Sequence, residues 1–230
     1  MPFSSRLVDA DTLCLECEVR PTKYSSHMRP IFPAFILIAA TAGHALAVSE
    51  TFDFNDPKNG NTATFKLVAP KETIQGSANG VTGSVKFDPQ NPAATSGRIV
   101  VATKSLVVPN PIMKMHLHSS TWLDVQKYPE IVFEVKELKN VKTEGDKTNA
   151  EVSGVFTLKG ISKELTVPVT LNYLKDKLSQ RQAGLKGDLL VVRATFSIQR
   201  SDFNVNAHQN EDKVADKIEL TLGIAGAAAQ

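Results

Sequence analysis

The segment Met113-Lys-Met-His-Leu-His118 holds the side chains of this sequence that could bind a metal. Thioether sulfur and imidazole nitrogen are ligands that suit copper. However, His116 and His118 would share a face only on a β-strand, whereas Met115 and His118 would share one only on a helix. Because no regular conformation gathers all four side chains, we predict no metal site. We interpret Met113 and Met115 as deformable apolar lining near a cavity mouth.

A second group of reactive side chains lies near the C-terminus, where Ser201, Asp202 and His208 supply the residue types of a hydrolase triad. No glycine-flanked nucleophile elbow, phosphate-binding loop or H-E-x-x-H motif accompanies them. We therefore interpret them as a polar loop and expect Arg200 and Asp202 to form an ion pair at a strand end. The prediction is a protein that is not an enzyme and needs no cofactor.

The N-terminal 47 residues have the layout of a secretory signal peptide. An apolar run over residues 31–42 follows Arg29 and precedes Ala45-Leu-Ala47, a small-x-small cleavage pattern. Met28 is the better start for such a leader, so residues 1–27 are interpreted as an extension of the gene model. The two cysteines of the chain precede Met28, and we assign them no function. We predict a domain over residues 48–230 that is periplasmic or secreted.

The charge of the chain is nearly balanced, with 26 Lys and Arg against 24 Asp and Glu. A nucleic-acid-binding protein carries a concentrated basic surface, so this class is not expected. The length after cleavage fits a single domain.

Short runs of alternating apolar and polar residues, separated by Gly, Pro and Asn, follow the leader. This pattern predicts an antiparallel all-β sandwich or barrel, and a closed barrel leaves no exposed edges. Two segments lack the alternation. Residues 110–125 are predicted to form one short helix, with Pro111 at its first position, followed by a turn. Residues 176–188 are predicted to form a mobile hairpin loop. The expected strands lie within residues 52–54, 63–67, 81–87, 99–103, 132–138, 151–158, 165–174, 189–198 and 218–224.

Four segments in this order resemble motifs of the YceI-like family, over about Phe52 to Ile224. The most specific is a turn followed by a strand that carries Ile131, Phe133 and Val135 on one face. The four segments are Val81-Thr-Gly-Ser-Val-Lys-Phe-Asp-Pro89, Trp122-Leu-Asp-Val-Gln-Lys-Tyr-Pro-Glu-Ile-Val-Phe-Glu-Val-Lys136, Ser153-Gly-Val-Phe-Thr-Leu-Lys-Gly-Ile-Ser-Lys163 and Phe196-Ser-Ile-Gln-Arg-Ser-Asp-Phe-Asn204. The resemblance implies a roughly eight-stranded lipocalin-like barrel that binds polyisoprenoid lipids.

The sequence departs from the family at three places. Asn61-Thr62 stands where the family often has His-Ser, and Met113-Lys114 stands where it often has Arg-Asp before His-Leu. Asn204 replaces a late glycine. The departures fall on positions that could contact a ligand headgroup, while the strand pattern is unchanged.

Small residues at candidate inward positions, such as Val155, Thr157 and Ala194, favour a cavity rather than a filled barrel. With the family resemblance, this predicts an exported protein that holds an isoprenoid lipid or isoprenoid quinone by its tail. The alternatives are a filled barrel that acts as a protein-interaction or stress-response module and, less favoured, a copper carrier. Transient membrane contact and a homodimer are both compatible with this interpretation. The residues expected to line the cavity or its entrance are Phe65, Phe87, Met113, Met115, Leu117, Trp122, Phe133, Phe156 and Phe196.

Overall fold

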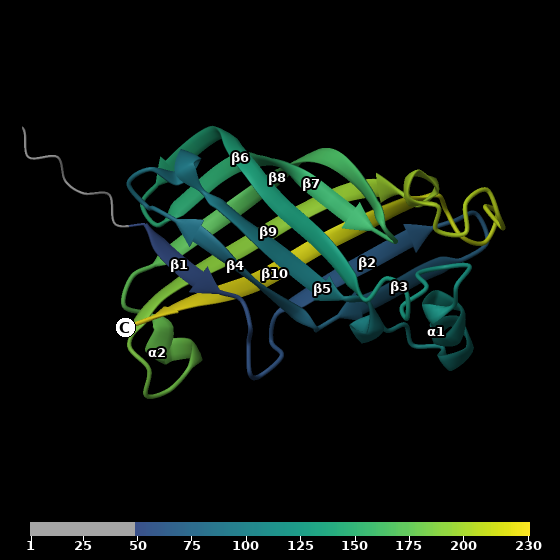
Figure 1. Cartoon of the computed structure of the whole chain (residues 1–230), viewed down its shortest axis with the longest axis horizontal. Coiled ribbons are helices and arrows are strands. Elements are labelled where there is room, and N and C mark those ends of the chain that lie inside the picture. The colour runs from purple at the N-terminus through teal and green to yellow at the C-terminus, as the bar shows by residue number, and fades with distance from the viewer. Residues whose placement is uncertain (1–48) are drawn as a thin grey trace, which may run out of the picture. The chain divides into compact units, whose positions relative to one another are not determined.

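The computed structural model describes residues 49–230, which form an antiparallel barrel (Figure 1). The predicted leader, the cleavage after Ala47 and the start at Met28 lie outside these residues. The strands are β1 (Glu50–Asp53), β2 (Thr62–Val68), β3 (Thr73–Ala78), β4 (Val81–Phe87), β5 (Ser96–Ala102), β6 (Glu130–Glu144), β7 (Lys147–Leu158), β8 (Ile161–Leu174), β9 (Gly187–Gln199) and β10 (Lys217–Ala229); the α-helices are α1 (Pro111–His118) and α2 (Leu178–Arg181), and the 3₁₀ turns are η1 (Pro92–Ala94), η2 (Thr103–Ser105) and η3 (Ser201–Phe203).

The ten strands close into an eight-stranded barrel because the first two barrel strands are each divided in two. Strands β1 and β2 lie in succession along the same edge of β10, with Asp53 opposite Ala227 and Thr62 opposite Gly223. Strand β4 pairs with β1, and β3 pairs with β2. Each remaining strand pairs antiparallel with its neighbours in sequence, from β4 through to β10. The predicted all-β antiparallel barrel with a short helix is therefore confirmed.

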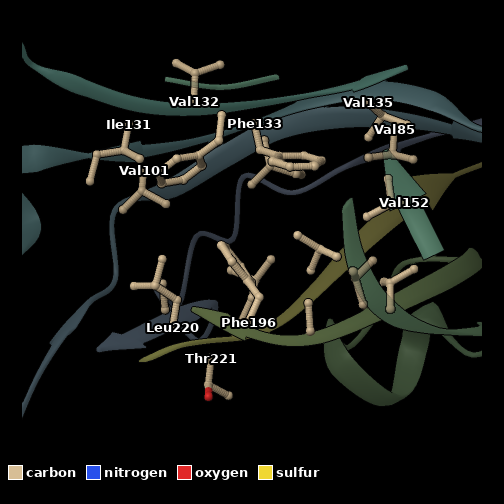
Figure 2. A pocket seen from close by; sticks show the side chains of 18 of the residues that line it. Val85, Val101, Ile131, Val132, Phe133, Val135, Val152, Phe196, Leu220 and Thr221 are labelled. Atoms are coloured by element: carbon tan, nitrogen blue, oxygen red, sulfur yellow. The ribbon is translucent and has the colours of Figure 1, made fainter. Parts of the chain in front are cut away.

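The register of β7 decides which of its side chains enter the barrel. Val152 and Phe156 are buried and point inward, and Figure 2 shows Val152 directed into the interior. Val155 and Thr157 alternate with them and lie on the outer face, where Val155 is opposite Glu134 and Glu164. The prediction that Val155 and Thr157 point inward was wrong, because neighbouring residues of a strand face opposite sides and Phe156 takes the inner one.

Strand β3 was missed by the sequence analysis because Gly76 interrupts a short run with few apolar residues. Gly76 lies opposite Phe65 of β2. A Cβ atom at Gly76 would overlap the ring of Phe65 and the carbonyl oxygen of Val107, so the close packing of these groups requires glycine. Strand β3 is bridged to Val107 on its other edge.

Helix α1 begins at Pro111, as predicted. The Asn110 side chain caps it, accepting hydrogen bonds from the backbone N–H groups of Ile112 (2.9 Å) and Met113 (3.2 Å). The turn that follows is closed by the N–H of Trp122, which donates to the carbonyl of Ser119 at 3.1 Å. Within residues 49–230, none of the helices is long and apolar enough to cross a membrane.

The segment predicted as a mobile hairpin loop, residues 176–188, contains α2 and is attached to the barrel at two points. The Leu178 side chain is fully buried. Arg181 Nη2 lies 2.6 Å from Asp56 Oδ2, and the Asp56 side chain is almost entirely buried. These contacts could not be expected from the Lys- and Gln-rich composition of the segment.

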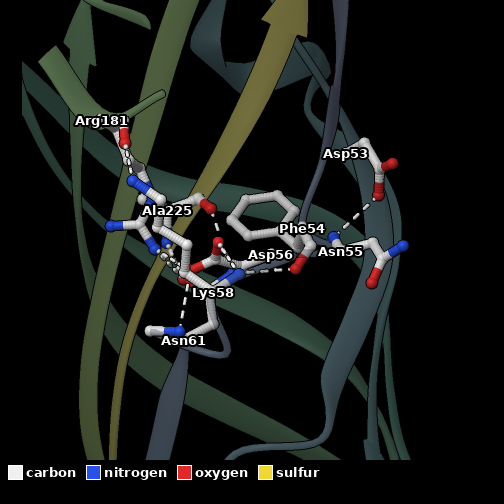
Figure 3. Close-up of polar contacts among 9 residues, drawn as sticks. Asp53, Phe54, Asn55, Asp56, Lys58, Asn61, Arg181 and Ala225 are labelled. Carbon is white, nitrogen blue, oxygen red and sulfur yellow. Dashed lines mark hydrogen bonds and ion pairs between the residues drawn. The ribbon is translucent and has the colours of Figure 1, made fainter. Parts of the chain in front are cut away.

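Asn61 completes the barrel wall at the gap between β1 and β2 (Figure 3). Its Oδ1 accepts from the N–H of Ala225 (2.8 Å), and its Nδ2 donates to the carbonyls of Ala225 (3.1 Å) and Phe54 (2.8 Å). The side-chain amide thus makes with β10 the pair of hydrogen bonds that a strand residue would make. Arg181 donates to the same Oδ1 at 3.0 Å and joins this point to the Asp56 carboxylate.

Replacing Asn61 with leucine should lower the free energy of unfolding by roughly 3 kcal/mol or more, because it leaves buried polar groups of Ala225 and Phe54 without partners. Urea unfolding measures the loss. The control is Asn55→Leu, an exposed position in the same connection, which should change stability by less than about 0.5 kcal/mol. Equal stability of the two variants would show that Asn61 does not close the wall.

A carboxyl cluster lies at the α2 end of the barrel. The Asp188 side chain is fully buried and accepts from the Tyr173 hydroxyl and from the N–H of Asp176 (2.7 Å). Oε2 of Glu50 is buried there and has no hydrogen-bond partner. Desolvation, followed by repulsion from the Asp188 carboxylate, raises the pKa of Glu50, whereas the Lys175 ammonium lowers it.

Ionisation of Glu50 therefore destabilises the fold. Because the folded-state pKa of Glu50 lies above its ordinary value of 4.5, its stabilising contribution is complete below that pH and is lost as pH rises through the folded-state pKa. We expect Glu50→Gln to raise the urea midpoint at about pH 7 and to leave it nearly unchanged at about pH 4. Glu144→Gln, at an exposed hairpin, serves as the control. A lower midpoint for Glu50→Gln at neutral pH would contradict this account.

Candidate functional site

A cavity of about 170 Å³ lies inside the barrel. Its lining is apolar apart from Thr64, Thr95 and Thr221, and the Thr221 side chain, like that of Val132, is directed away from the interior (Figure 2). Phe133, Phe196 and Ala194 point inward but keep accessible surface, because they border this empty space.

The cavity exists because most inward positions carry small or β-branched side chains. Valines and alanines on several strands surround four phenylalanines from β2, β6, β7 and β9: Phe65, Phe133, Phe156 and Phe196. Phe156 and Phe196 meet edge to face, with ring centroids 6.1 Å apart. For scale, an apolar cavity of about 150 Å³ in another protein stays dry and binds benzene. The interior therefore has room for a short apolar segment.

A second, outer pocket of about 420 Å³ lies between the β2–β3 hairpin, α1 and the loop over residues 205–216. Phe65 lines both the cavity and this outer pocket, so its ring forms part of the wall between them. The outer pocket is amphipathic. Its apolar lining comes from Phe65, Leu67, Ile74, Val108, Met113, Leu117, Trp122 and Val214, and its polar lining from Glu72, His116, Asn210 and Lys213.

Arg200 holds the loop that forms one side of the outer pocket. It is fully buried, and its guanidinium donates to backbone carbonyls of the loop, including Gln209 (2.7 Å) and Val214 (3.1 Å). It also lies 5.8 Å from the centre of the Trp122 ring. The predicted ion pair of Arg200 with Asp202 was wrong: Asp202 pairs with Lys163 at 2.5 Å on the surface, while Arg200 turns into the loop.

Lys159 connects the same loop to the turn after α1. Its ammonium donates to the carbonyls of Thr121 (2.9 Å) and Asn204 (2.8 Å). Burial lowers the pKa of Lys159, although Asp124 opposes the shift. Two cations bound to carbonyl groups thus fix the rim of the outer pocket, one from β7–β8 and one from the end of β9.

Comparison with known proteins agrees with this architecture. Residues 48–225 match the family model described as the YceI-like domain. The chain belongs to the YceI-like family. A UPF0312 protein of Yersinia pestis is 30% identical over 190 residues, covering 81% of this chain and 90% of that protein. A UPF0312 protein of Pseudomonas aeruginosa is 28% identical over 190 residues, which again cover 81% of this chain and 90% of that protein.

Two solved structures show the same fold as this YceI-like chain. BcnA of Burkholderia cenocepacia has a TM-score of 0.58 at 23% identity and covers 72% of this chain and 95% of its own. A polyisoprenoid binding domain from Saccharophagus degradans has a TM-score of 0.56 at 8% identity, and the match covers 79% of this chain and 99% of that domain.

The structure places the nine predicted lining residues in three groups. Phe65, Phe133, Phe156 and Phe196 line the cavity, and Met113, Leu117 and Trp122 line the outer pocket with Phe65. Phe87 and Met115 line neither space.

Phe87 and Met115 lie outside both linings for separate reasons. Phe87 is buried against Phe52 and Tyr173 at the α2 end of the barrel, where aromatic rings fill the interior. Met115 is 64% exposed, because it lies half a turn from Met113 and Leu117 on α1 and faces away from the pocket.

The sequence analysis did not include the polar lining of the outer pocket or the valines of the cavity among the expected lining residues. Asn210 and Lys213 come from a loop whose position depends on Arg200, and no local sequence pattern reveals this. The cavity valines, such as Val101, Val135 and Val192, could have been found from the strand alternation once one inward residue on each strand was known.

The candidate catalytic and metal-binding side chains do not meet. The Ser201 hydroxyl donates to Asp216 at 2.7 Å, and His208 is exposed and lies 3.7 Å from Glu211. His118 Nε2 donates to the Leu106 carbonyl at 2.8 Å, whereas His116 lines the outer pocket. Among the residues described, no three His, Cys, Asp or Glu side chains are grouped to hold a metal ion.

Replacing Phe65 with alanine should join the cavity to the outer pocket. We expect uptake of an apolar dye such as N-phenyl-1-naphthylamine to become about tenfold faster. This corresponds to an entry barrier that is about 1.4 kcal/mol higher in wild type, where the Phe65 ring must be displaced. Stopped-flow fluorescence measures the rate. Phe133→Ala is the control, because it enlarges the cavity without opening this wall. An equal acceleration in both variants would contradict the assignment of Phe65 to the wall.

Proposed function

We propose that this YceI-like protein is an exported carrier of one isoprenoid lipid, with the tail in the cavity and the polar end in the outer pocket. The observation that carries the proposal is an apolar cavity and a larger amphipathic pocket that share the Phe65 ring as a lining residue. That arrangement matches the two ends of an amphiphilic molecule. The name of the Saccharophagus neighbour, a polyisoprenoid binding domain, points to the same ligand class.

The size of the two spaces supports a ligand that occupies both. The cavity of about 170 Å³ holds only a short part of a polyprenyl chain, whereas the outer pocket has the volume of an ordinary small-molecule site. Each CH₂ group transferred from water contributes about 0.8 kcal/mol, so ten buried carbons supply about 8 kcal/mol before the costs of binding. The Phe65 ring must move aside for a chain that passes between the spaces.

The polar lining favours an uncharged headgroup, and we propose an isoprenoid quinone rather than a polyprenyl phosphate. Glu72 and Lys213 supply one charge of each sign, which does not favour a dianion. His116 and Asn210 can hydrogen-bond to quinone oxygens, and Trp122 offers an aromatic face. The leader pattern at residues 31–47 supports a periplasmic or secreted location, where such a lipid needs shielding from water.

Delipidated protein should bind a soluble short-chain isoprenoid quinone at one site per chain with a micromolar dissociation constant, measured by isothermal titration calorimetry. Ala194→Trp should weaken binding at least about tenfold, because an indole ring takes up most of a cavity of this size. Val155→Trp is the matched control, since it adds the same side chain to the outer face and should leave binding unchanged.

Two results would contradict the proposal. One is the absence of heat and of any saturable binding by folded wild-type protein. The other is equal binding by wild type and by a folded Ala194→Trp variant, which would place the ligand outside the barrel.

A further inference from the structure

Helix α1 carries apolar side chains on two faces. Met113 and Leu117 point to the outer pocket and line it. Ile112 and Met115 lie three residues apart on another face and are 63% and 64% exposed. An isolated surface helix of this length normally has one apolar face, which is buried. Ile112 and Met115 therefore form an exposed apolar pair beside the outer pocket, on a face of α1 that does not line it.

The chain around α1 is cationic. No Asp or Glu occurs between Asp88 and Asp124, whereas Arg98, Lys104 and Lys114 lie in this stretch. Arg98 pairs with Glu130 and Glu134, which leaves the two lysines. Helix α1 itself contains no acidic residue and has His116 and His118 in its last turn. An exposed apolar pair on a helix that carries Lys114 and no acidic residue is complementary to a bilayer surface with anionic headgroups.

We propose that the α1 end of the barrel docks on an anionic membrane, with Ile112 and Met115 inserted among the headgroups. This inference rests on the proposed lipid-carrying function and adds the route by which the ligand enters the protein. The ligand enters from the bilayer beneath α1, reaches the outer pocket past Met113 and Leu117, and continues into the cavity past Phe65. Two apolar side chains and two lysines make a reversible contact, as a carrier requires.

The test is co-sedimentation of the full folded chain with vesicles of equal parts phosphatidylglycerol and phosphatidylcholine, without isoprenoid. Wild type should bind, and the double variant Ile112→Ser/Met115→Ser should bind about tenfold more weakly. Leu185→Ser is the matched control and should bind like wild type. Leu185 is also exposed (44%) but lies between α2 and β9, at the opposite end of the barrel (Figure 1).

Charge is tested separately. Lys114→Gln, a change to phosphatidylcholine alone, or high salt should each weaken vesicle binding, because surface electrostatic attraction is screened by ions. Wild type that fails to sediment with anionic vesicles, or a double variant that binds like wild type, would overturn the docking inference. So would dimerisation of wild type through Ile112 and Met115, seen by analytical ultracentrifugation, because a second copy would then cover this face.

Failure of docking can be told from failure of the lipid-carrying function. The double variant keeps the cavity and the outer pocket, so it should bind the soluble short-chain quinone as tightly as wild type. Quinone binding by wild type without vesicle binding refutes docking alone. Vesicle binding that depends on Ile112 and Met115, without quinone binding, supports docking and refutes the carried ligand.

Discussion

The hydrogen bonds between the Asn61 side chain and the backbone of Ala225 are the contacts on which closure of the barrel depends. Strand β10 must be paired along both edges, yet its partner on one edge is broken between β1 and β2. Asn61 supplies a donor and an acceptor at this gap, where a peptide group would otherwise be required. An open edge would expose unpaired backbone groups and admit water to the interior.

A closed wall makes the interior a separate environment, and the side chains that face it decide what it can contain. At the α2 end, Phe52, Phe87 and Tyr173 fill the space, and the buried Asp188 binds the Tyr173 hydroxyl. Beyond this cluster most inward residues are valines and alanines, and the cavity opens there. Towards α1 the cavity is bordered by the phenylalanine rings that pack with Leu117 and Trp122. At the α1 end the Phe65 ring borders both the cavity and the outer pocket. Under the proposed function, this arrangement orients a bound amphiphile with its polar end towards α1.

Much of the fold could be predicted from the sequence, because alternation and turn residues are local signals. The same signals predicted α1 and the four phenylalanines that line the cavity. The function of Asn61 could not be predicted, since its partner Ala225 is 164 residues away. Arg200 was given the wrong partner for a similar reason: its five carbonyl acceptors come from a loop without regular structure. Val155 of β7 was assigned to the inner face by mistake, because alternation alone does not say which of the two alternating sets of side chains faces inward.

The proposed function requires the space inside the barrel to be a lipid site. The most direct test is native mass spectrometry of protein that has been purified from cells without organic solvent or detergent. Its organic extract is then analysed by mass spectrometry. The account predicts a fraction of chains with one bound lipid and an isoprenoid in the extract. Chains that carry no lipid, and that also take up none when incubated with isoprenoid-containing membranes, would contradict it.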